Sequence, residues 1–111
     1  MRLPRADEAI VPVEKLRDYV LSRSHPVGRT KAKFFASLGY TEGEWGRLAA
    51  DIRSQHLRLD AEEAESSKYG MKFVITGPLT GHSGATVILT SFWVIRAGEE
   101  RPRFVTAYPG E

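Results

Sequence analysis

The sequence predicts an α+β fold, with two to three N-terminal helices packed on one face of a three- to four-stranded antiparallel sheet. Apolar residues recur with a helical period in the first half of the chain and alternate with a period of two after Gly70. Helices followed by a run of hairpin-linked strands are typical of the α+β class. The chain has 111 residues, so we expect one domain over residues 1–111, with its helical part at about 13–59 and its sheet at about 70–108.

The first helix is predicted at residues 13–22. Pro12 stands directly before this segment, where a missing N–H group costs little. The helix is expected to end before Pro26, because the residue that precedes a proline is pushed out of the helical region. The apolar positions recur at i, i+3 and i+4 spacing and would form one buried face: Val13, Leu16, Tyr19 and Val20.

A second helix is predicted at residues 28–38, and a third from Thr41 to about residues 55–59. Thr41 and Glu44 match the capping box that opens many helices. The polar and acidic residues 60–69 indicate either a solvated extension of the third helix or a loop. The apolar face of the second helix would consist of Ala32, Phe35 and Leu38, and that of the third of Trp45, Leu48, Ala49 and Ile52.

The second half predicts strands separated by turn signals. Alternation from Gly70 indicates a half-buried strand, and Gly77–Pro78 indicates a bulge or bend in it. Residues 85–96 are apolar on both faces, which predicts the central strand. A last strand is predicted at residues 103–108. The turns that separate the three strands are expected at residues 81–84 and 98–102.

Composition narrows the class of protein. The chain has no cysteine, which excludes disulfides, thiol catalysis and zinc ribbons. Its histidines lack the spacing of metal motifs, and no P-loop, dinucleotide-binding or nucleophile-elbow motif occurs, so we expect no metal and no cofactor. The N-terminus lacks the apolar core of a signal peptide, and no apolar run approaches about 18 residues, so we expect a cytoplasmic protein with no membrane partner. A domain of a larger secreted toxin is the alternative that fits the same observations.

Residues 25–40 concentrate positive charge. They include Arg29, Lys31 and Lys33, and residues 19–41 contain no aspartate or glutamate. Arg29 and Lys33 are four apart and would share a helix face, whereas Lys31 is turned away from them. Because guanidinium and ammonium groups neutralise phosphate, the stretch indicates an anion-binding site. A solvated helix face is the alternative that stays open.

The residues selected as catalytic candidates are His25, Lys31, Thr106 and Tyr108. An imidazole titrates near neutral pH and can act as a general base, although a capping or surface histidine is equally compatible with this position. Thr106 and Tyr108 are two apart on the last predicted strand, so they share a face, on which Phe104 is also expected. Their hydroxyl groups could orient a scissile phosphate, or Tyr108 could simply cover the sheet edge.

Arg29, Lys33 and Arg96 are the candidates for substrate binding. Arg96 has the parity to share a face of the central strand with Thr90, but an arginine that faces solvent fits the same pattern. His56 falls near the apolar face of the third helix and is read as a buried structural histidine, and His82 is read as an exposed turn residue.

Two long motifs resemble an uncharacterised bacterial family of unknown function. They are KLRDYVLSRSHPVGRTKAKFFASLGY at Lys15–Tyr40, and KYGMKFVITGPLTGHSG, FWVI and RPRFVTAYPG within Lys68–Gly110. The chain departs from the family pattern at His82–Ser83, where Pro-Asn is common, and at Phe73, where Tyr is common. The family in turn looks like the barnase/EndoU/colicin/RelE-like ribonuclease group, in which helices precede a four-stranded antiparallel sheet.

That resemblance implies a toxin module or toxin–antitoxin partner, with His25, Lys31, Thr106 and Tyr108 around one cleft. Two interpretations stay open. The first is a metal-independent endoribonuclease that cleaves RNA by 2′-OH attack to a 2′,3′-cyclic phosphate and is neutralised by a cognate antitoxin or immunity protein. The second is a non-catalytic module that binds protein or RNA. The discriminating observation is whether those side chains meet.

Overall fold

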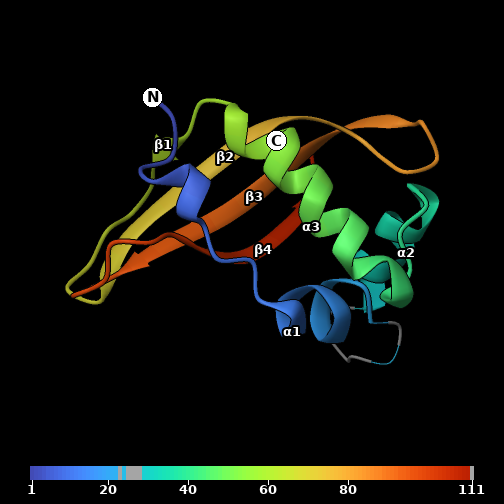
Figure 1. Ribbon diagram of the computed structural model, residues 1–111, viewed down its shortest axis with the longest axis horizontal. Coiled ribbons are helices and arrows are strands. Elements are labelled where there is room, and N and C mark those ends of the chain that lie inside the picture. The colour runs from blue at the N-terminus through green and yellow to red at the C-terminus, as the bar shows by residue number, and fades with distance from the viewer. Residues whose placement is uncertain (23, 25–28, 111) are drawn as a thin grey trace.

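The computed structural model describes residues 1–22, 24 and 29–110 (Figure 1). Helices come first and one four-stranded antiparallel sheet follows, with strand order β1-β2-β3-β4, so the predicted α+β class is confirmed. The helices are α1 (Val13–Lys15), α2 (Arg29–Ser37) and α3 (Trp45–Ser54). The strands are β1 (Glu62–Glu63), β2 (Gly70–Thr80), β3 (Thr86–Arg96) and β4 (Arg103–Pro109).

The first predicted helix is shorter and less regular than expected. α1 spans three residues and continues as a wider π-helical turn at Leu16–Val20, which closes with Leu21 N–H donating to Leu16 O at 2.8 Å. The wider turn lets Leu16, Val20 and Leu21 all enter the core, where each is at most 2% exposed. Burial of these three side chains therefore accounts for the departure from a regular helix.

The third helix begins without the expected capping box. Thr41 makes no side-chain capping bond, and a 3-10 turn at Glu42–Glu44 precedes α3, with Glu44 N–H donating to Thr41 O at 2.8 Å. Trp45 is 38% exposed and does not join the core, whereas Leu48 and Ile52 are fully buried as predicted.

The longest pairing in the sheet joins β2 to β3. It runs without interruption from Gly70↔Arg96 to Thr80↔Thr86, so Gly77–Pro78 forms no bulge in this pairing. β1 pairs with Phe73 and Val74 of β2 and does not reach Pro78. At Pro78, β2 is therefore an edge strand, where the missing N–H group of a proline breaks no hydrogen-bond ladder. β1 itself lies in the acidic segment that predicted a loop or a helix extension.

A β-bulge changes the parity of β4. Phe92 pairs with Thr106 and Trp93 pairs with Phe104, so Val105 is an extra residue on β4. Phe104 therefore faces the opposite side from Thr106 and Tyr108, contrary to the prediction. It is 1% exposed and packs edge-on against Trp93, with ring centroids 5.4 Å apart.

α3 and the N-terminal segment cover one face of the sheet, and Figure 1 shows α3 crossing that face and α2 to one side of it. The inner face is buried and contributes Phe73, Ile75, Leu79, Leu89, Ser91, Trp93, Phe104 and Ala107. The residues of opposite parity form what we call the outer face, which is exposed or half-buried at most positions. It consists of Lys72, Val74 and Thr76 of β2, Ile88, Thr90, Phe92 and Val94 of β3, and Thr106 and Tyr108 of β4.

His56 is fully buried between the helices and the inner face, as the sequence indicated. Its Nε2 lies 3.1 Å from the carbonyl oxygen of Leu89, which can only accept, so Nε2 carries the hydrogen. Nδ1 must then accept from the Ser91 hydroxyl at 2.8 Å, and the Ser91 oxygen accepts from Trp93 Nε1–H at 2.9 Å. Burial lowers the pKa of His56, because a charged imidazole would lose its hydration.

We expect acid to destabilise the fold through His56. Its pKa is lowered in the folded state, so the unfolded state binds the proton more tightly and the free energy of unfolding falls as pH drops below about 6.5. Urea unfolding at about pH 7.5 and about pH 5.5 measures this drop. The fall in unfolding free energy between the two pH values should be smaller in His56→Gln and unchanged in His82→Gln. The His56→Gln substitution should itself lower the free energy of unfolding by about 1–3 kcal/mol. An unchanged drop in His56→Gln would contradict the assignment.

Candidate functional site

Lys31 joins three segments that are distant in sequence. Its Nζ donates to the Tyr19 hydroxyl at 2.8 Å and to Thr106 Oγ1 at 3.0 Å. Tyr19 belongs to the π-helical turn, Lys31 to α2 and Thr106 to β4. Nζ also lies 4.9 Å from the centre of the Tyr19 ring, within the range of a cation–π contact. We call Tyr19, Lys31 and Thr106 the lysine cluster.

Among the described residues, no carboxylate neutralises the positive charge of the lysine cluster. Lys31 is half-buried, and none of the ion pairs found between described residues involves it. An ammonium group has three donor hydrogens, and its two described hydrogen-bond acceptors are neutral hydroxyls. A partly desolvated cation of this kind favours an anionic ligand.

The Tyr19 phenol responds to this charge. The hydrogen bond from Lys31 lowers the pKa of Tyr19, burial opposes that effect, and the Thr106 hydroxyl and the charges of Lys31 and Lys15 lower it further. A tyrosine with a lowered pKa gives up its proton more readily than a free phenol does, which suits it to proton transfer.

The last strand, β4, adds the Tyr108 ring to the outer face, next to Phe92. Thr106 and Tyr108 pair with Phe92 and Thr90 on the outer face, so they share a side as predicted. The Tyr108 ring stacks on Phe92, with centroids 5.4 Å apart and an interplanar angle of 28°. The outer face thus holds an aromatic pair next to Thr106.

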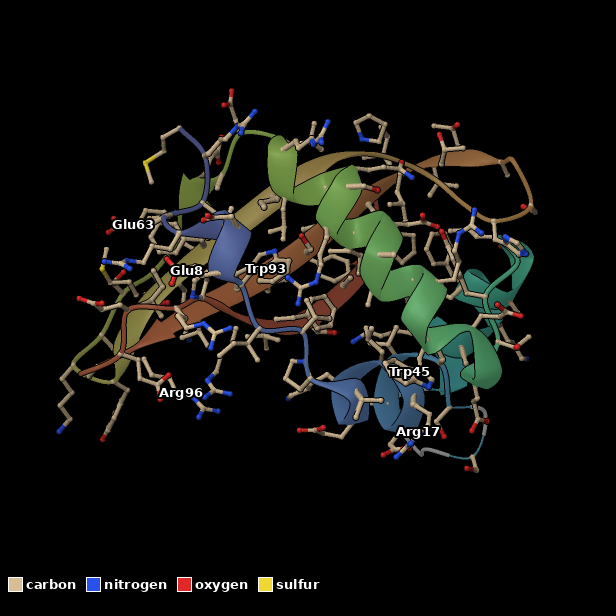
Figure 2. The ribbon with its side chains drawn as sticks, viewed as in Figure 1. Glu8, Arg17, Trp45, Glu63, Trp93 and Arg96 are labelled. Atoms are coloured by element: carbon tan, nitrogen blue, oxygen red, sulfur yellow. The ribbon has the colours of Figure 1, made fainter. Side chains whose placement is uncertain are left out.

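Two sequence candidates lie away from the lysine cluster. Lys33 is exposed and, two positions after Lys31, is rotated by about 200° around α2. Arg96 is exposed at the end of β3, four residues beyond Phe92 and therefore roughly 13 Å along the strand. Figure 2 shows Arg96 at the opposite end of the molecule from Arg17 and Trp45.

His25 lies outside the described residues. Arg29 opens α2, but its side chain also lies outside what the structure describes. Of the four catalytic candidates, the described part of the chain brings Lys31 into contact with Thr106 and places Tyr108 two residues farther along the same strand.

A groove on the outer face begins at Thr106. It has a volume of about 610 Å³ and extends across the sheet toward the segment that follows β1. Its floor is mainly apolar, with one ammonium and one carboxylate group. The lining residues are Ala64, Glu65, Lys72, Phe92, Trp93, Val94, Val105 and Thr106.

No group of three or more His, Asp or Glu side chains is placed to hold a metal ion within residues 1–22, 24 and 29–110. No helix in that part of the chain has the length and apolar character needed to span a membrane.

Tyr19 is the site residue that the sequence interpretation missed. It recurs with Leu16 and Val20 at helical spacing, so it was assigned to a buried apolar face. The available signal was its hydroxyl, because a tyrosine on an apolar stripe needs a polar partner for that group. The acid-free, cation-rich residues that follow could have supplied one.

A solved structure shares this fold, and a relative is similar in sequence. A chain in a structure of a contact-dependent growth inhibition toxin–immunity protein complex from Klebsiella pneumoniae 342 superposes with a TM-score of 0.66 at 19% identity, covering 92% of this chain and 100% of that one. An ornithine carbamoyltransferase from Clavibacter michiganensis subsp. michiganensis (strain NCPPB 382) is 31% identical over 105 residues, covering 80% of this chain. The chain spans about a third of that relative's length (34%). A family model matches residues 2–111, and the chain therefore belongs to the family described as Domain of unknown function (DUF6883).

Proposed function

We propose that the chain is a metal-independent endoribonuclease of toxin type. The observation that carries the proposal is the Lys31 ammonium, bound to the hydroxyls of Tyr19 and Thr106 without a carboxylate partner among the described residues. A phosphodiester is the anion that fits a cation flanked by hydroxyl donors. The aromatic pair beside Thr106 favours a nucleic acid over inorganic phosphate, because bases stack on such rings.

The proposed reaction is attack within the RNA itself. A base takes the proton from a ribose 2′-OH, the 2′-oxygen bonds to the adjacent phosphorus, and the bond from phosphorus to the 5′-oxygen breaks. The products are a 2′,3′-cyclic phosphate and a 5′-hydroxyl. We assign the base role to His25 on its chemistry, since an imidazole is neutral and able to accept a proton near pH 7.

The lysine cluster acts on the phosphate and the leaving group. Lys31 stabilises the negative charge that grows on the phosphoryl oxygens, and Thr106 orients them. Tyr19 donates its proton to the departing 5′-oxygen, a role supported by its contact with Lys31 and its lowered pKa. The Tyr108 ring packs on the Phe92 ring, and Tyr108 would border the bound phosphate. Arg29, Lys33 and Arg96 would bind phosphates farther along the RNA.

We also propose a neutralising protein partner. The similar fold from Klebsiella pneumoniae occurs in a toxin–immunity protein complex, which supports a cognate immunity protein or antitoxin for this chain. The alternative, a module that binds protein or RNA without catalysis, would leave the lysine cluster as a binding site and would show no RNA cleavage.

Replacing Lys31 should abolish cleavage. Lys31→Met removes the charge from the lysine cluster, and we expect the rate of RNA cleavage in EDTA to fall by about 10²-fold or more. Lys68→Met removes an exposed lysine outside the lysine cluster and should retain most activity. Gel analysis of total RNA measures both, with circular dichroism to check folding. A folded Lys31→Met variant that cuts as fast as wild type would refute the site.

The base assignment has its own test. His25→Ala should lower the cleavage rate by about 10²–10⁴-fold, the usual contribution of positioned acid–base catalysis. His82→Ala changes an exposed turn histidine and serves as the control. Full activity in His25→Ala, with Lys31→Met inactive, would move the base to another residue and leave the phosphate site standing.

The coupling between Lys31 and Tyr19 can be measured directly. The ultraviolet absorbance of phenolate, taken as wild type minus Tyr19→Phe during a pH titration, isolates Tyr19 from the other tyrosines. We expect its pKa to lie below the usual value of about 10 and to rise in Lys31→Met, because the donor that stabilises the phenolate is gone. No rise would show that Lys31 does not set the proton affinity of Tyr19.

A further inference from the structure

The groove on the outer face has no role in the proposed reaction. Thr106, however, belongs both to the lysine cluster and to the lining of the groove. Its hydroxyl accepts from Lys31, and the same residue lines the groove on its β4 side. A ligand held at Lys31 therefore has the groove as its immediate neighbour on the outer face. The volume of about 610 Å³ lies within the range of roughly 300–1,000 Å³ that is usual for sites that bind small organic groups.

The β-bulge shapes the floor of this groove. Val105 is the extra residue on β4, and it lines the groove together with Thr106 on β4 and with Phe92 and Val94 on β3. Bulges commonly re-aim side chains next to functional sites. The result is an apolar floor that includes the Phe92 ring, which suits a flat group with apolar faces.

The charges of the groove orient its occupant. Lys31 lies beyond the Thr106 end of the groove, whereas Glu65, in the segment after β1, lies near the opposite edge. That segment is held beside β2 by the hydrogen bond that Ala64 N–H donates to Lys72 O at 2.8 Å. A phosphate is favoured beside Lys31 and disfavoured beside Glu65. A base edge offers both N–H donors and acceptors, which the Glu65 carboxylate and the Lys72 ammonium can bind.

We propose that this groove is a nucleobase subsite for single-stranded RNA. A phosphate bound by Lys31 and Thr106 places the neighbouring unpaired base on the floor formed by Phe92, Val94 and Val105, with its polar edge toward Lys72 and Glu65. The inference rests on the proposed ribonuclease function and extends it by naming the substrate class: RNA must be unpaired at the cut, because a base held in a duplex cannot enter the groove.

Binding of uncleavable RNA tests the subsite without relying on cleavage. A fluorescent 2′-O-methyl hexanucleotide lacks the attacking hydroxyl, and an abasic hexamer of the same backbone lacks the bases. We expect wild-type protein to bind the base-bearing strand about 10-fold or more tightly than the abasic one in fluorescence anisotropy, because stacking on a protein ring strengthens binding by about that factor per base. Equal affinity, or no binding of either strand, overturns the subsite.

Matched variants locate the effect. Phe92→Leu keeps an apolar side chain but removes the ring, and it should reduce the preference for bases to less than about threefold. Trp45→Leu removes an exposed ring from the helical side and should keep the preference. Lys72→Met, with Lys68→Met as its control, provides a second pair at exposed positions in case Phe92→Leu misfolds. In this second pair, Lys72→Met should weaken binding of the base-bearing strand more than Lys68→Met.

The outcomes separate the two proposals. A preference for bases that survives both Phe92→Leu and Lys72→Met overturns the subsite, whatever the cleavage assay gives. Loss of the preference in Phe92→Leu, with Trp45→Leu unchanged, supports the subsite. If wild type does not cut RNA but the preference holds, the ribonuclease proposal fails and the groove remains a site for unpaired bases.

Discussion

One buried imidazole joins the helical layer to the inner face of the sheet. Both ring nitrogens of His56 form hydrogen bonds to β3, one with the Ser91 hydroxyl and one with the Leu89 carbonyl. The imidazole can therefore lie between the helical layer and the sheet without an unpaired nitrogen. Trp93 completes the network through the same serine. With the inner face closed in this way, the alternate residues of β3 are left to the outer face, where they can contact a ligand.

The outer face becomes a candidate site through two local departures from regular structure. The π-helical turn at Leu16–Val20 carries Tyr19, and the bulge at Val105 restores Thr106 and Tyr108 to the outer face after Phe104 has entered the core. Lys31 then connects both departures by its two hydrogen bonds. Such irregularities often occur at functional sites, and here they place the Lys31 ammonium beside an apolar groove.

Much of the fold could be predicted from the sequence because its periodicities are strong. The switch from helical to alternating spacing at Gly70, and the turn signal at Gly81–Gly84, correspond to α3 followed by β2 and β3. The sequence did not reveal β1, because a strand of two glutamates has no apolar alternation. Two features depend on which side chains reach the core: the face of β4 that Phe104 occupies, and the π-helical turn at Leu16–Val20. The spacing of apolar residues in the sequence does not determine either one.

The candidate site was partly visible for the same reasons. Lys31 and Thr106 could be selected from charge pattern and strand parity, but their contact across 75 positions is a property of the tertiary fold. Tyr19 was hidden because its ring follows the apolar period. Charge predicts Lys33, and charge together with strand parity predicts Arg96, but neither signal fixes where a side chain lies relative to Lys31.

The chemistry of the RNA ends tests the proposed function most directly. RNA incubated with wild-type protein in EDTA, and analysed by mass spectrometry, should carry 2′,3′-cyclic phosphate and 5′-hydroxyl ends, and the ends should be absent with Lys31→Met. Intact RNA, or fragments with 5′-phosphate ends, would contradict attack by the 2′-oxygen at the lysine cluster.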